Sequence, residues 1–272
     1  MGRFQYGVCE WSVRARGKEL CKLAADLKLD CIQLGAGEEI FAGRGLGSGN
    51  MLEEYLAASE KYGVKIESLS PQFVDQYSFT MPKNISEEQI AVELVNKTIE
   101  LCTVLGCHYF LLPILCKNDI CDGQSFHKAV EYIKRFSDKA GGKGIETYLE
   151  LNQNASQIHD LLDAVDDPAV KIFFDSQNLY AHNGTSMARH FSELAEFIGG
   201  IHLKDGAGSV LSGSLLGEGT SGFFKTAQAI INSDYSGSLI IENVYGKPTV
   251  CCMGSEKELL AKDVETLHRV FD

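Results

Sequence analysis

The sequence lacks a run of about 18 apolar residues, a C-x-x-C motif and an excess of positive charge. We therefore expect no membrane span, and the nine cysteines indicate neither a zinc knuckle nor a disulfide framework. Because 25 Lys and Arg stand against 37 Asp and Glu, the net charge is −12, and a nucleic acid is not an expected partner. A charged and apolar signal segment is also missing at the start, so we predict a cytoplasmic protein.

One pattern repeats eight times along the 272 residues: a short apolar run, a turn, an amphipathic segment, and Gly or Asp before the next run. Short apolar runs are typical of strands covered on both faces, and strands that alternate with helices form a parallel sheet. Eight units in a chain of this length favour a closed (β/α)8 TIM barrel, one domain over residues 1–272, rather than an open doubly wound sheet. The predicted strands are residues 4–11, 31–34, 64–69, 109–112, 146–151, 170–175, 200–203 and 238–243.

Helix boundaries are marked by Asn or Ser followed three residues later by Glu or Gln, which is the spacing of a capping box. Gly63 and Gly106 follow helical patterns, at positions where a C-terminal cap with positive φ favours glycine. We predict helix starts at three such pairs: Asn50 with Glu53, Ser86 with Gln89, and Ser255 with Glu258.

Four acid or imidazole residues stand at or near the ends of separate predicted strands: Glu150, Asp175, His202 and Glu242. They are 25, 27 and 40 residues apart, about one strand-plus-helix unit each or somewhat more. Taken singly, each has an ordinary explanation, such as a surface Glu, a helix-capping Asp or a buried core His. Because the strand ends at one face of a parallel barrel converge, the set of four predicts a shared divalent-metal site.

Further motifs follow in a fixed order: Asp-x-x-Asn at 175–178, Ile-His-Leu-Lys-Asp-Gly at 201–206, Leu-Gly-Glu-Gly at 216–219 and Tyr-Ser-Gly at 235–237. With this ordered set the sequence resembles the xylose isomerase-like TIM barrel family of sugar isomerases and epimerases, over nearly its whole length. The resemblance implies a divalent ion, manganese, magnesium, cobalt or zinc, and a small carbohydrate substrate. It implies that the ion is held by Glu150, Asp175, His202 and Glu242.

The resemblance also implies a mechanism. A divalent ion that binds a carbonyl oxygen and the neighbouring hydroxyl makes the adjacent C–H more acidic and stabilises an enediolate. In family members that epimerise ketoses, the glutamates corresponding to Glu150 and Glu242 stand on opposite sides of the substrate; one removes a proton and the other returns one. We therefore expect a metal-dependent isomerase or epimerase of a small sugar or polyhydroxy ketone, with Glu150 and Glu242 as catalytic residues.

Contacts with the substrate are predicted at four further positions: Asn178, Lys204, Trp11 and Glu218. Plainer explanations exist for three of them: a solvated loop for Lys204, core packing for Trp11 and an ordinary turn for Glu218. Compared with free-ketose 3-epimerases, the chain has Asn178, Ser156 and Gly208 where those enzymes typically carry His, Glu and Arg. This argues against an epimerase of the D-tagatose or D-psicose type.

Two alternatives to an isomerase or epimerase stay open. An inosose- or dehydroshikimate-type dehydratase begins with the same proton abstraction but expels a hydroxyl, so its product loses the mass of water. A non-catalytic sugar-binding barrel is the third hypothesis, although such a protein has no need of two metal-bound glutamates. The resemblance also allows a homo-oligomer, because barrel enzymes of this sort are often dimers or tetramers.

Overall fold

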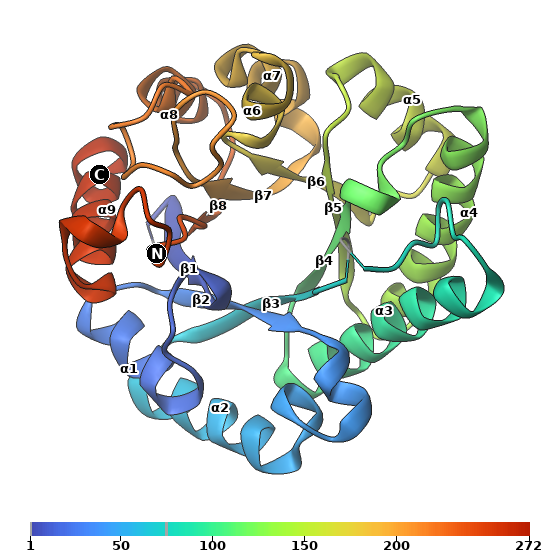
Figure 1. Cartoon of the computed structure of the whole chain (residues 1–272), viewed down its shortest axis with the longest axis horizontal. Helices are drawn as coiled ribbons and strands as arrows, with labels where there is room; N and C mark the ends of the chain where they lie inside the picture. Colours follow the sequence, from blue (N-terminus) through green and yellow to red (C-terminus); the bar gives the residue numbers. More distant parts are fainter. Residues whose placement is uncertain (1, 74–75) are drawn as a thin grey trace. The chain divides into compact units, whose positions relative to one another are not determined.

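A computed structural model describes residues 2–73 and 76–272. Its eight strands follow one another in chain order around a closed parallel barrel (Figure 1). This confirms the predicted (β/α)8 TIM-barrel fold and excludes the open doubly wound sheet. The strands are β1 (Phe4–Cys9), β2 (Cys31–Ala36), β3 (Lys65–Pro71), β4 (Tyr109–Ile114), β5 (Glu146–Leu151), β6 (Val170–Asp175), β7 (Ile198–Leu203) and β8 (Gly237–Ile241).

One or two α-helices follow each strand in the described residues. Their starts and ends obey local chemistry: Asn84 caps the helix that begins at Ile85, and Gly106, with φ 70°, ends it. The helices are α1 (Gly17–Asp26), α2 (Gly49–Tyr62), α3 (Ile85–Leu105), α4 (Gly123–Gly141), α5 (Ala155–Val165), α6 (Asn178–Asn183), α7 (Met187–Leu194), α8 (Phe223–Asn232) and α9 (Glu256–Phe271).

By the contacts between its residues, the chain divides into two compact units. The first unit comprises residues 1–33, 57–65 and 174–272, and the second unit comprises residues 34–56 and 66–173. In the first unit β1 lies between β2 and β8 (Figure 1), and Gly7 is in register with Cys31 on one side and with Ile240 on the other. Next to β8 lies β7, where His202 is in register with Ile240.

The strands of the first unit form from β-branched and other apolar residues that the fold buries completely. Val8, Ile201 and Ile240 have no exposed surface. Burying an aliphatic side chain of this size stabilises the fold by about 1.5 to 3 kcal/mol. The polar residues that share these strands must therefore be paired or ligated, because an unpaired buried polar group is costly.

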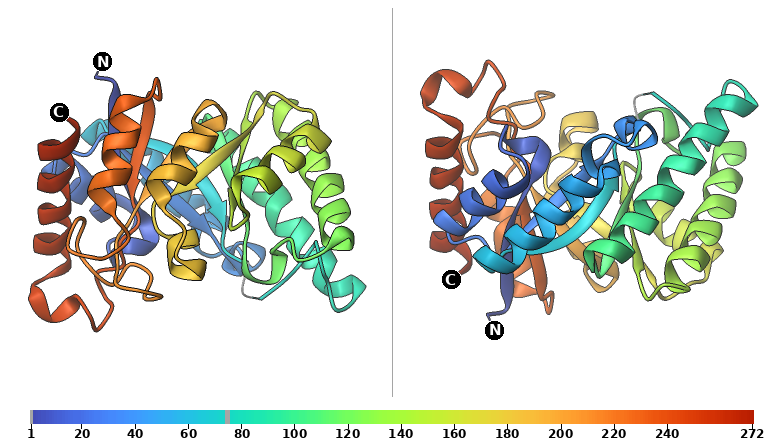
Figure 2. Two further views of the ribbon diagram at one scale, coloured as in Figure 1. Left: turned by 90° about the horizontal axis from the view of Figure 1, so that it is seen from above. Right: turned by 90° about the horizontal axis from the view of Figure 1, so that it is seen from below.

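The two ends of the chain meet within the first unit. The rings of Phe4 and Phe271 are 5.4 Å apart in an edge-to-face arrangement, and the Tyr6 hydroxyl donates to Asp272 Oδ1 at 2.6 Å. The first strand and the last helix are thus side by side, as both views in Figure 2 show. This contact fixes α9 against β1 and so helps to hold the strand that precedes Trp11.

The second unit contains β4 between β3 and β5, with Tyr109 in register with Ser68 on one side and Glu146 on the other. Its helices α3 and α4 run beside each other, which is visible in Figure 2. Helices α4 and α5 both begin with capping boxes, at Asp122 and Asn154. These caps fix the start of each helix directly after the loop that leaves the preceding strand.

Two boundary predictions are confirmed to the residue, strands 146–151 and 170–175. The first strand is shorter than predicted: it ends at Cys9, and Trp11 lies in a short 3-10 helix, η1 (Glu10–Ser12). The predicted helix starts at Asn50 and Ser86 are wrong. Asn50 is already inside α2, and Asn84, two residues before Ser86, is the residue that caps α3.

The helix start at Ser255 is confirmed, with the capping box to Glu258 complete. Gly63 and Gly106 both have positive φ, 68° and 70°, as predicted for residues after a helix. None of the described helices has the length and apolar character that a membrane span requires. All nine cysteines are described, and none is in a disulfide.

Candidate metal centre

Three of the four predicted ligands lie together in the first unit. Asp175 is the last residue of β6, His202 is in β7, and Glu242 directly follows β8. One ligand atom from each lies within 4.8 Å of the corresponding atom of the other two. The carboxyl ends of these strands therefore bring two carboxylates and one imidazole to one place.

Asp175 is oriented by the backbone that follows it. Its Oδ1 accepts hydrogen bonds from the backbone N–H groups of Gln177 at 2.8 Å and Asn178 at 2.6 Å. Its Oδ2 faces the Lys204 Nζ at 2.9 Å. Because the first turn of α6 holds one oxygen, the other is directed to the cluster. Asn178, a predicted substrate contact, is placed beside the cluster by the same hydrogen bond.

His202 has no exposed surface, and its two ring nitrogens face different partners. Nδ1 lies 3.6 Å from Glu242 Oε2. Nε2 lies 2.6 Å from the amide oxygen of Gln33 and 3.4 Å from the sulfur of Cys9. The imidazole is thus positioned between a carboxylate on one side and an amide and a thiol on the other.

Glu242 receives a hydrogen bond on each carboxylate oxygen. The Trp11 indole N–H donates to Oε1 at 2.9 Å, and the Lys204 ammonium donates to Oε2 at 2.5 Å. Burial by itself raises the pKa of this carboxyl group, but the charges of His202 and Lys204 and the two hydrogen bonds outweigh burial and lower the pKa to about 2. Glu242 is therefore ionised at neutral pH.

Lys204 lies between the two carboxylates, 2.9 Å from Asp175 Oδ2 and 2.5 Å from Glu242 Oε2. It is only 5% exposed, so the solvated loop considered for this residue is wrong. An ammonium in this position compensates two negative charges that otherwise repel each other in a buried site. The structure thus shows that this place binds positive charge.

A second lysine, Lys247, extends the positive charge near the cluster. Burial lowers the pKa of Lys247, the charge of Lys204 lowers it further, and Glu242 acts in the opposite direction. The Lys247 ammonium donates to the backbone carbonyl of Leu211. No sequence pattern singles out Lys247, because it follows the last strand by six residues in an irregular segment.

Asp205, next to Lys204, is a buried carboxylate that holds the loop after β7. Its Oδ2 accepts from the backbone N–H groups of Gly217 and Gly219, each at 3.0 Å, and its Oδ1 accepts from the Ser221 hydroxyl at 2.7 Å. A Cβ on Gly219 would lie 2.2 Å from Asp205 Oδ1, so only glycine fits there. The Gly-Glu-Gly motif therefore packs its backbone on Asp205.

Glu218 lies on the exposed side of this loop. It lines a cavity of about 240 Å³ together with Lys262, Glu265 and Arg269, and none of the three clustered ligands is part of that lining. Its predicted contact with a substrate stays a prediction. Trp11, by contrast, contacts the cluster directly through its hydrogen bond to Glu242.

Glu150 belongs to the second unit. It is the next-to-last residue of β5, is in register with Pro113 of β4, and is buried. A buried carboxylate in a strand requires a compensating partner, and ligation of a metal ion is one way to supply it. Its place near the carboxyl end of β5 corresponds to those of the other three residues on their own strands.

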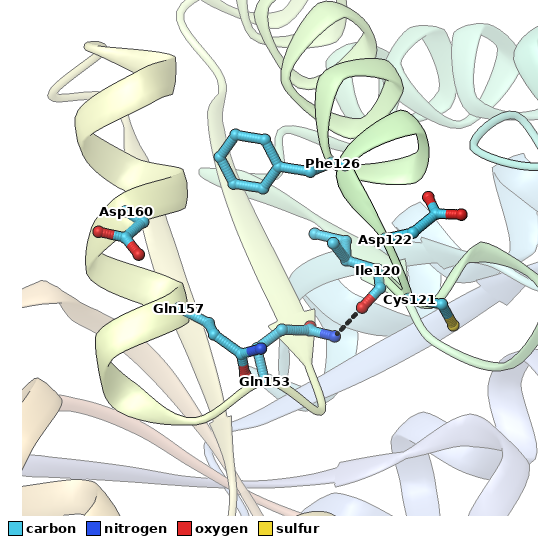
Figure 3. A pocket seen from close by; sticks show the side chains of 8 residues that line it. Ile120, Cys121, Asp122, Phe126, Gln153, Gln157 and Asp160 are labelled. Carbon is cyan, nitrogen blue, oxygen red and sulfur yellow. Dashed lines mark hydrogen bonds between the residues drawn. The ribbon is translucent and has the colours of Figure 1, made fainter.

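The second unit also contains a cavity of about 240 Å³ between α4 and α5 (Figure 3). Phe126 from α4 and Gln157 and Asp160 from α5 line it, and the Gln153 side chain donates to the carbonyl of Ile120 at its base. None of the predicted site residues is part of this lining. The cavity therefore contributes no support to the predicted metal site.

Two residues of the cluster were missed at the level of sequence, Cys9 and Gln33. Both lie on strands of the first unit, and both are fully buried. The Cys9 thiol donates to the Gln33 amide oxygen at 3.3 Å. The one signal for them is the amide of Gln33 in an otherwise apolar run, Cys-Ile-Gln-Leu, because a buried amide needs polar partners.

The donor set fits a divalent cation. Carboxylate oxygens with one imidazole nitrogen are ligands that manganese, magnesium, cobalt and zinc accept, and the Lys204 ammonium already lies where positive charge is stabilised. With Lys204 turned aside, three ligand atoms lie at or just after the ends of three strands: Asp175 Oδ2, His202 Nδ1 and Glu242 Oε2. A divalent ion would thus be held on the rigid part of the fold.

A family model described as "Xylose isomerase-like TIM barrel" matches residues 21–269. The chain belongs to the xylose isomerase-like TIM barrel family. A relative from an Actinoplanes species, named 2-epi-5-epi-valiolone 7-phosphate 2-epimerase, is 26% identical over 244 residues, which are 88% of this chain and 87% of that relative. This membership agrees with the family that the ordered motifs of the second half resemble.

Solved structures of the xylose isomerase-like fold superpose over nearly the whole chain. D-allulose 3-epimerase from Methylomonas sp., in complex with D-allulose, has a TM-score of 0.77 at 18% identity and covers 100% of this chain and 98% of its own. A probable 3-DHS dehydratase of petrobactin synthesis from Bacillus anthracis has a TM-score of 0.73 at 15% identity and covers 97% and 98%. At these identities the likeness shows a common fold.

Proposed function

We propose that this xylose isomerase-like protein is a divalent-metal-dependent isomerase or epimerase of a small sugar or polyhydroxy ketone. The observation that carries the proposal is the cluster of Asp175, His202 and Glu242, whose ligand atoms lie within 4.8 Å of one another. The Actinoplanes relative, which is named as the 2-epimerase of a valiolone 7-phosphate, supports the reaction class. Manganese is the ion we test first, since it accepts both carboxylate and imidazole ligands.

Glu150 is proposed as the fourth ligand. Near the carboxyl end of β5, it occupies the strand position that corresponds to those of the three clustered residues, and it is buried. In a closed parallel barrel the carboxyl ends of all strands open at the same face. The order of the strands therefore supports a set of two glutamates, one aspartate and one histidine.

Proton transfer is assigned to the two glutamates. A bound divalent ion supplies Lewis-acid stabilisation for negative charge on neighbouring substrate oxygens. One glutamate, ionised as Glu242 is, accepts the proton from the carbon next to the carbonyl, and the C–H electron pair moves into the enediolate. The other glutamate then returns a proton to that carbon from the opposite side for an epimerase; for an isomerase the proton goes to the neighbouring carbon.

Lys204 and Trp11 assist these steps in the proposal. The Trp11 N–H orients Glu242 through its hydrogen bond to Oε1. The Lys204 ammonium is buried, so it donates a hydrogen bond to a negative substrate oxygen more effectively than a solvated lysine would. Asn178 and Glu218 are kept as further proposed substrate contacts.

A dehydratase is the second candidate, and the buried Lys204 favours it. An ammonium 2.5 Å from the proposed base Glu242 provides a proton donor beside a proton acceptor, which is what expulsion of a hydroxyl as water requires. The enediolate then loses the hydroxyl on the next carbon, and Lys204 supplies the proton for the water that leaves. The mass of the product separates the two candidates, because isomers keep their mass.

The test uses the purified protein reconstituted with manganese, magnesium, cobalt or zinc and incubated in D2O with ketoses, inososes and their phosphates. Deuterium gain in a substrate or its isomer, followed by mass spectrometry and NMR, supports an isomerase or epimerase. Loss of water supports the dehydratase. If the protein has bound the ion and neither deuterium gain nor loss of water occurs with any substrate of the panel, the non-catalytic sugar-binding barrel is favoured.

Variants then test the assigned roles. We expect Glu150→Gln and Glu242→Gln each to reduce deuterium exchange by about 10²- to 10⁴-fold, the usual contribution of a general acid or base, while circular dichroism stays that of the wild type. Glu131→Gln, on the exposed side of α4, serves as a matched carboxylate outside the proposed site. Normal turnover in Glu150→Gln would remove that residue from the mechanism.

A further inference from the structure

Two different sets of possible metal ligands share His202 in the first unit. One set is the pair of carboxylates described above, Asp175 and Glu242, with His202. In the other set Cys9 takes the place of Asp175. The first set offers oxygen and one imidazole nitrogen, which suit magnesium and manganese, whereas a thiolate in the second set favours zinc and other thiophilic ions. The nitrogen of His202 that carries the lone pair decides between them.

The two ring nitrogens face different members of the two sets. Nδ1 lies 3.6 Å from Glu242 Oε2, a residue that both sets share. Nε2 lies 3.4 Å from the sulfur of Cys9, on the thiol side. A neutral imidazole has one N–H and one lone pair, so an ion bound at one nitrogen leaves the proton at the other.

Gln33 stands at the nitrogen on the thiol side. Its amide oxygen is 2.6 Å from His202 Nε2 and also accepts from the Cys9 thiol at 3.3 Å. An amide oxygen accepts and never donates, so this contact favours the His202 tautomer that carries its proton on Nε2. All three residues are fully buried, so no bulk water replaces this acceptor.

We propose that Gln33 is a specificity-determining residue of the metal site. By fixing the proton of His202 on Nε2, it presents Nδ1 to the ion together with Asp175 and Glu242. The same amide oxygen accepts the hydrogen bond of the Cys9 thiol, which directs the sulfur to Gln33 and away from the ion. The site then offers an ion carboxylate oxygens and one imidazole nitrogen without the thiolate, so it favours zinc over manganese less strongly than a site that includes Cys9. This inference rests on the proposed function, because it requires that an ion binds at His202.

The opposite orientation of the Gln33 amide would turn its NH2 group toward Nε2 and toward the sulfur. The lone pair of His202 would then lie on Nε2, and Nδ1 would carry the proton. Oxygen and nitrogen of an amide differ only in their hydrogen-bonding role, so the proton on His202 is the observable that separates the two orientations. Its position can be measured directly in the metal-free protein.

The first measurement is the ¹⁵N NMR spectrum of metal-free protein labelled at histidine, assigned with His202→Gln. We expect the neutral Nε2–H form for His202 in the wild type. The Nδ1–H form would overturn the proposal, whatever the ion affinity. Gln33→Glu is the conservative variant, because a carboxylate oxygen also accepts from Nε2 and should keep the Nε2–H form.

The second measurement is ion selectivity, by competition between manganese and zinc in the wild type, Gln33→Leu and Gln33→Glu. Loss of a residue that orients a ligand typically changes metal affinity by roughly 10- to 100-fold. We expect Gln33→Leu to shift the preference toward zinc by at least about tenfold. When this variant is loaded with cobalt, it should show a thiolate-to-metal absorption that the wild type lacks. Gln33→Glu should retain the wild-type preference.

The double variant Gln33→Leu with Cys9→Ala tests the thiol. It should lose both the thiolate absorption and the shift toward zinc, while circular dichroism controls for folding in every variant. Unchanged selectivity in folded Gln33→Leu would overturn the role of Gln33 and leave the proposed function intact. A wild type that binds no divalent ion would overturn the proposed function itself, and the inference with it.

Discussion

At the scale of single residues, the site depends on how a small number of buried charges compensate one another. Lys204 is within 3 Å of both Asp175 Oδ2 and Glu242 Oε2, at 2.9 and 2.5 Å. A divalent ion at the same carboxylates would compete with this ammonium. The occupancy of the site by an ion and the position of Lys204 are therefore coupled in our proposal.

Replacing the lysine tests this coupling. Lys204→Met should destabilise the metal-free protein by about 3 to 5 kcal/mol, the usual effect of removing one partner from a buried ion pair. Addition of manganese should raise the melting temperature of the variant more than that of the wild type, because the ion replaces the lost positive charge. Thermal unfolding with and without manganese, after chelator treatment, measures both effects.

Lys22→Met provides the control, because its ion pair with Asp26 is exposed on α1 and exposed pairs contribute little to stability. An equal response of wild type and Lys204→Met to manganese would show that the ammonium and the ion do not share a site.

Lys247 gives a prediction about the charge of the substrate. Its pKa responds to burial, to Lys204 and to Glu242, so its ammonium acts on the same cluster. If the substrate carries a phosphate, Lys247→Met should raise KM about tenfold, which corresponds to about 1.4 kcal/mol, and leave kcat largely unchanged. Steady-state kinetics with phosphorylated and unphosphorylated forms of one sugar check this, and the unphosphorylated form should show no change. A similar loss with both forms would contradict phosphate recognition.

At the scale of elements, the boundary of a helix or strand is predictable from the sequence when the interaction that determines it is local. Strands 146–151 and 170–175 were predicted to the residue, since short apolar runs end sharply at Asn152 and Ser176. The start of α3 was misplaced at Ser86 because the motif is satisfied equally well two residues earlier, where Asn84 accepts from the Glu87 N–H at 2.9 Å. A capping motif in the sequence therefore locates the start of a helix only to within one turn.

The two candidate caps of α3, Asn84 and Ser86, can be compared by mutation. Asn84→Ala should lower the free energy of unfolding by about 1 kcal/mol, because it removes the side chain that caps α3. Ser86→Ala, inside the helix, should change it by less than about 0.5 kcal/mol. Urea unfolding followed by circular dichroism distinguishes them, and an equal or larger effect at Ser86 would mean that the helix begins where the sequence motif first indicated.

Gln33 shows why part of the site was beyond prediction. Its partners Cys9 and His202 come from strands 24 and 169 residues away, and the amide in an apolar run indicates only that Gln33 needs polar partners, not which residues they are. The proposed ligands could be predicted, because acids and a histidine at the ends of successive strands are all residue types that bind a divalent ion. Residues that orient ligands have no such common signature in sequence.

At the scale of the whole molecule, the number of strand-plus-helix units was enough to predict the fold. Eight repeats predicted the closed barrel that the structure has, and boundary errors such as the one at Trp11 did not affect that conclusion. Closure depends on the number and order of the strands, which an error of two residues leaves unchanged. The ordered motifs of the second half likewise predicted the family that matches residues 21–269.

Stability as a function of pH reflects buried acids throughout the fold, and Asp263 and Glu242 should act in opposite directions. Asp263 on α9 has no exposed surface, and it accepts hydrogen bonds from Asn243 and Tyr245 at 2.7 Å each. Burial raises its pKa from 3.8 to about 6, although these hydrogen bonds lower it in part. The folded state therefore binds the Asp263 proton more tightly than the unfolded state does.

The sign of the effect follows from that difference. Asp263 contributes stability that is fully present below pH 3.8 and is lost as the pH rises through 6, a change of about 3 kcal/mol. Glu242, with a pKa lowered from 4.5 to about 2, contributes stability that is present above pH 4.5 and is lost as the pH falls toward 2. For these two groups together, metal-free protein should be most stable near pH 4, where Asp263 is still largely protonated and Glu242 is ionised.

Urea unfolding of metal-free wild type and Asp263→Asn from pH 3 to pH 8 tests the prediction. The variant need not match the wild type in absolute stability, because its amide also donates hydrogen bonds; the quantity compared is the change between pH 4 and pH 6. This loss of stability should largely disappear in Asp263→Asn. In Tyr245→Phe the loss should occur at higher pH, because one hydrogen bond that lowers the pKa of Asp263 is removed. A slope in Asp263→Asn as steep as in the wild type would show that another group titrates in this range.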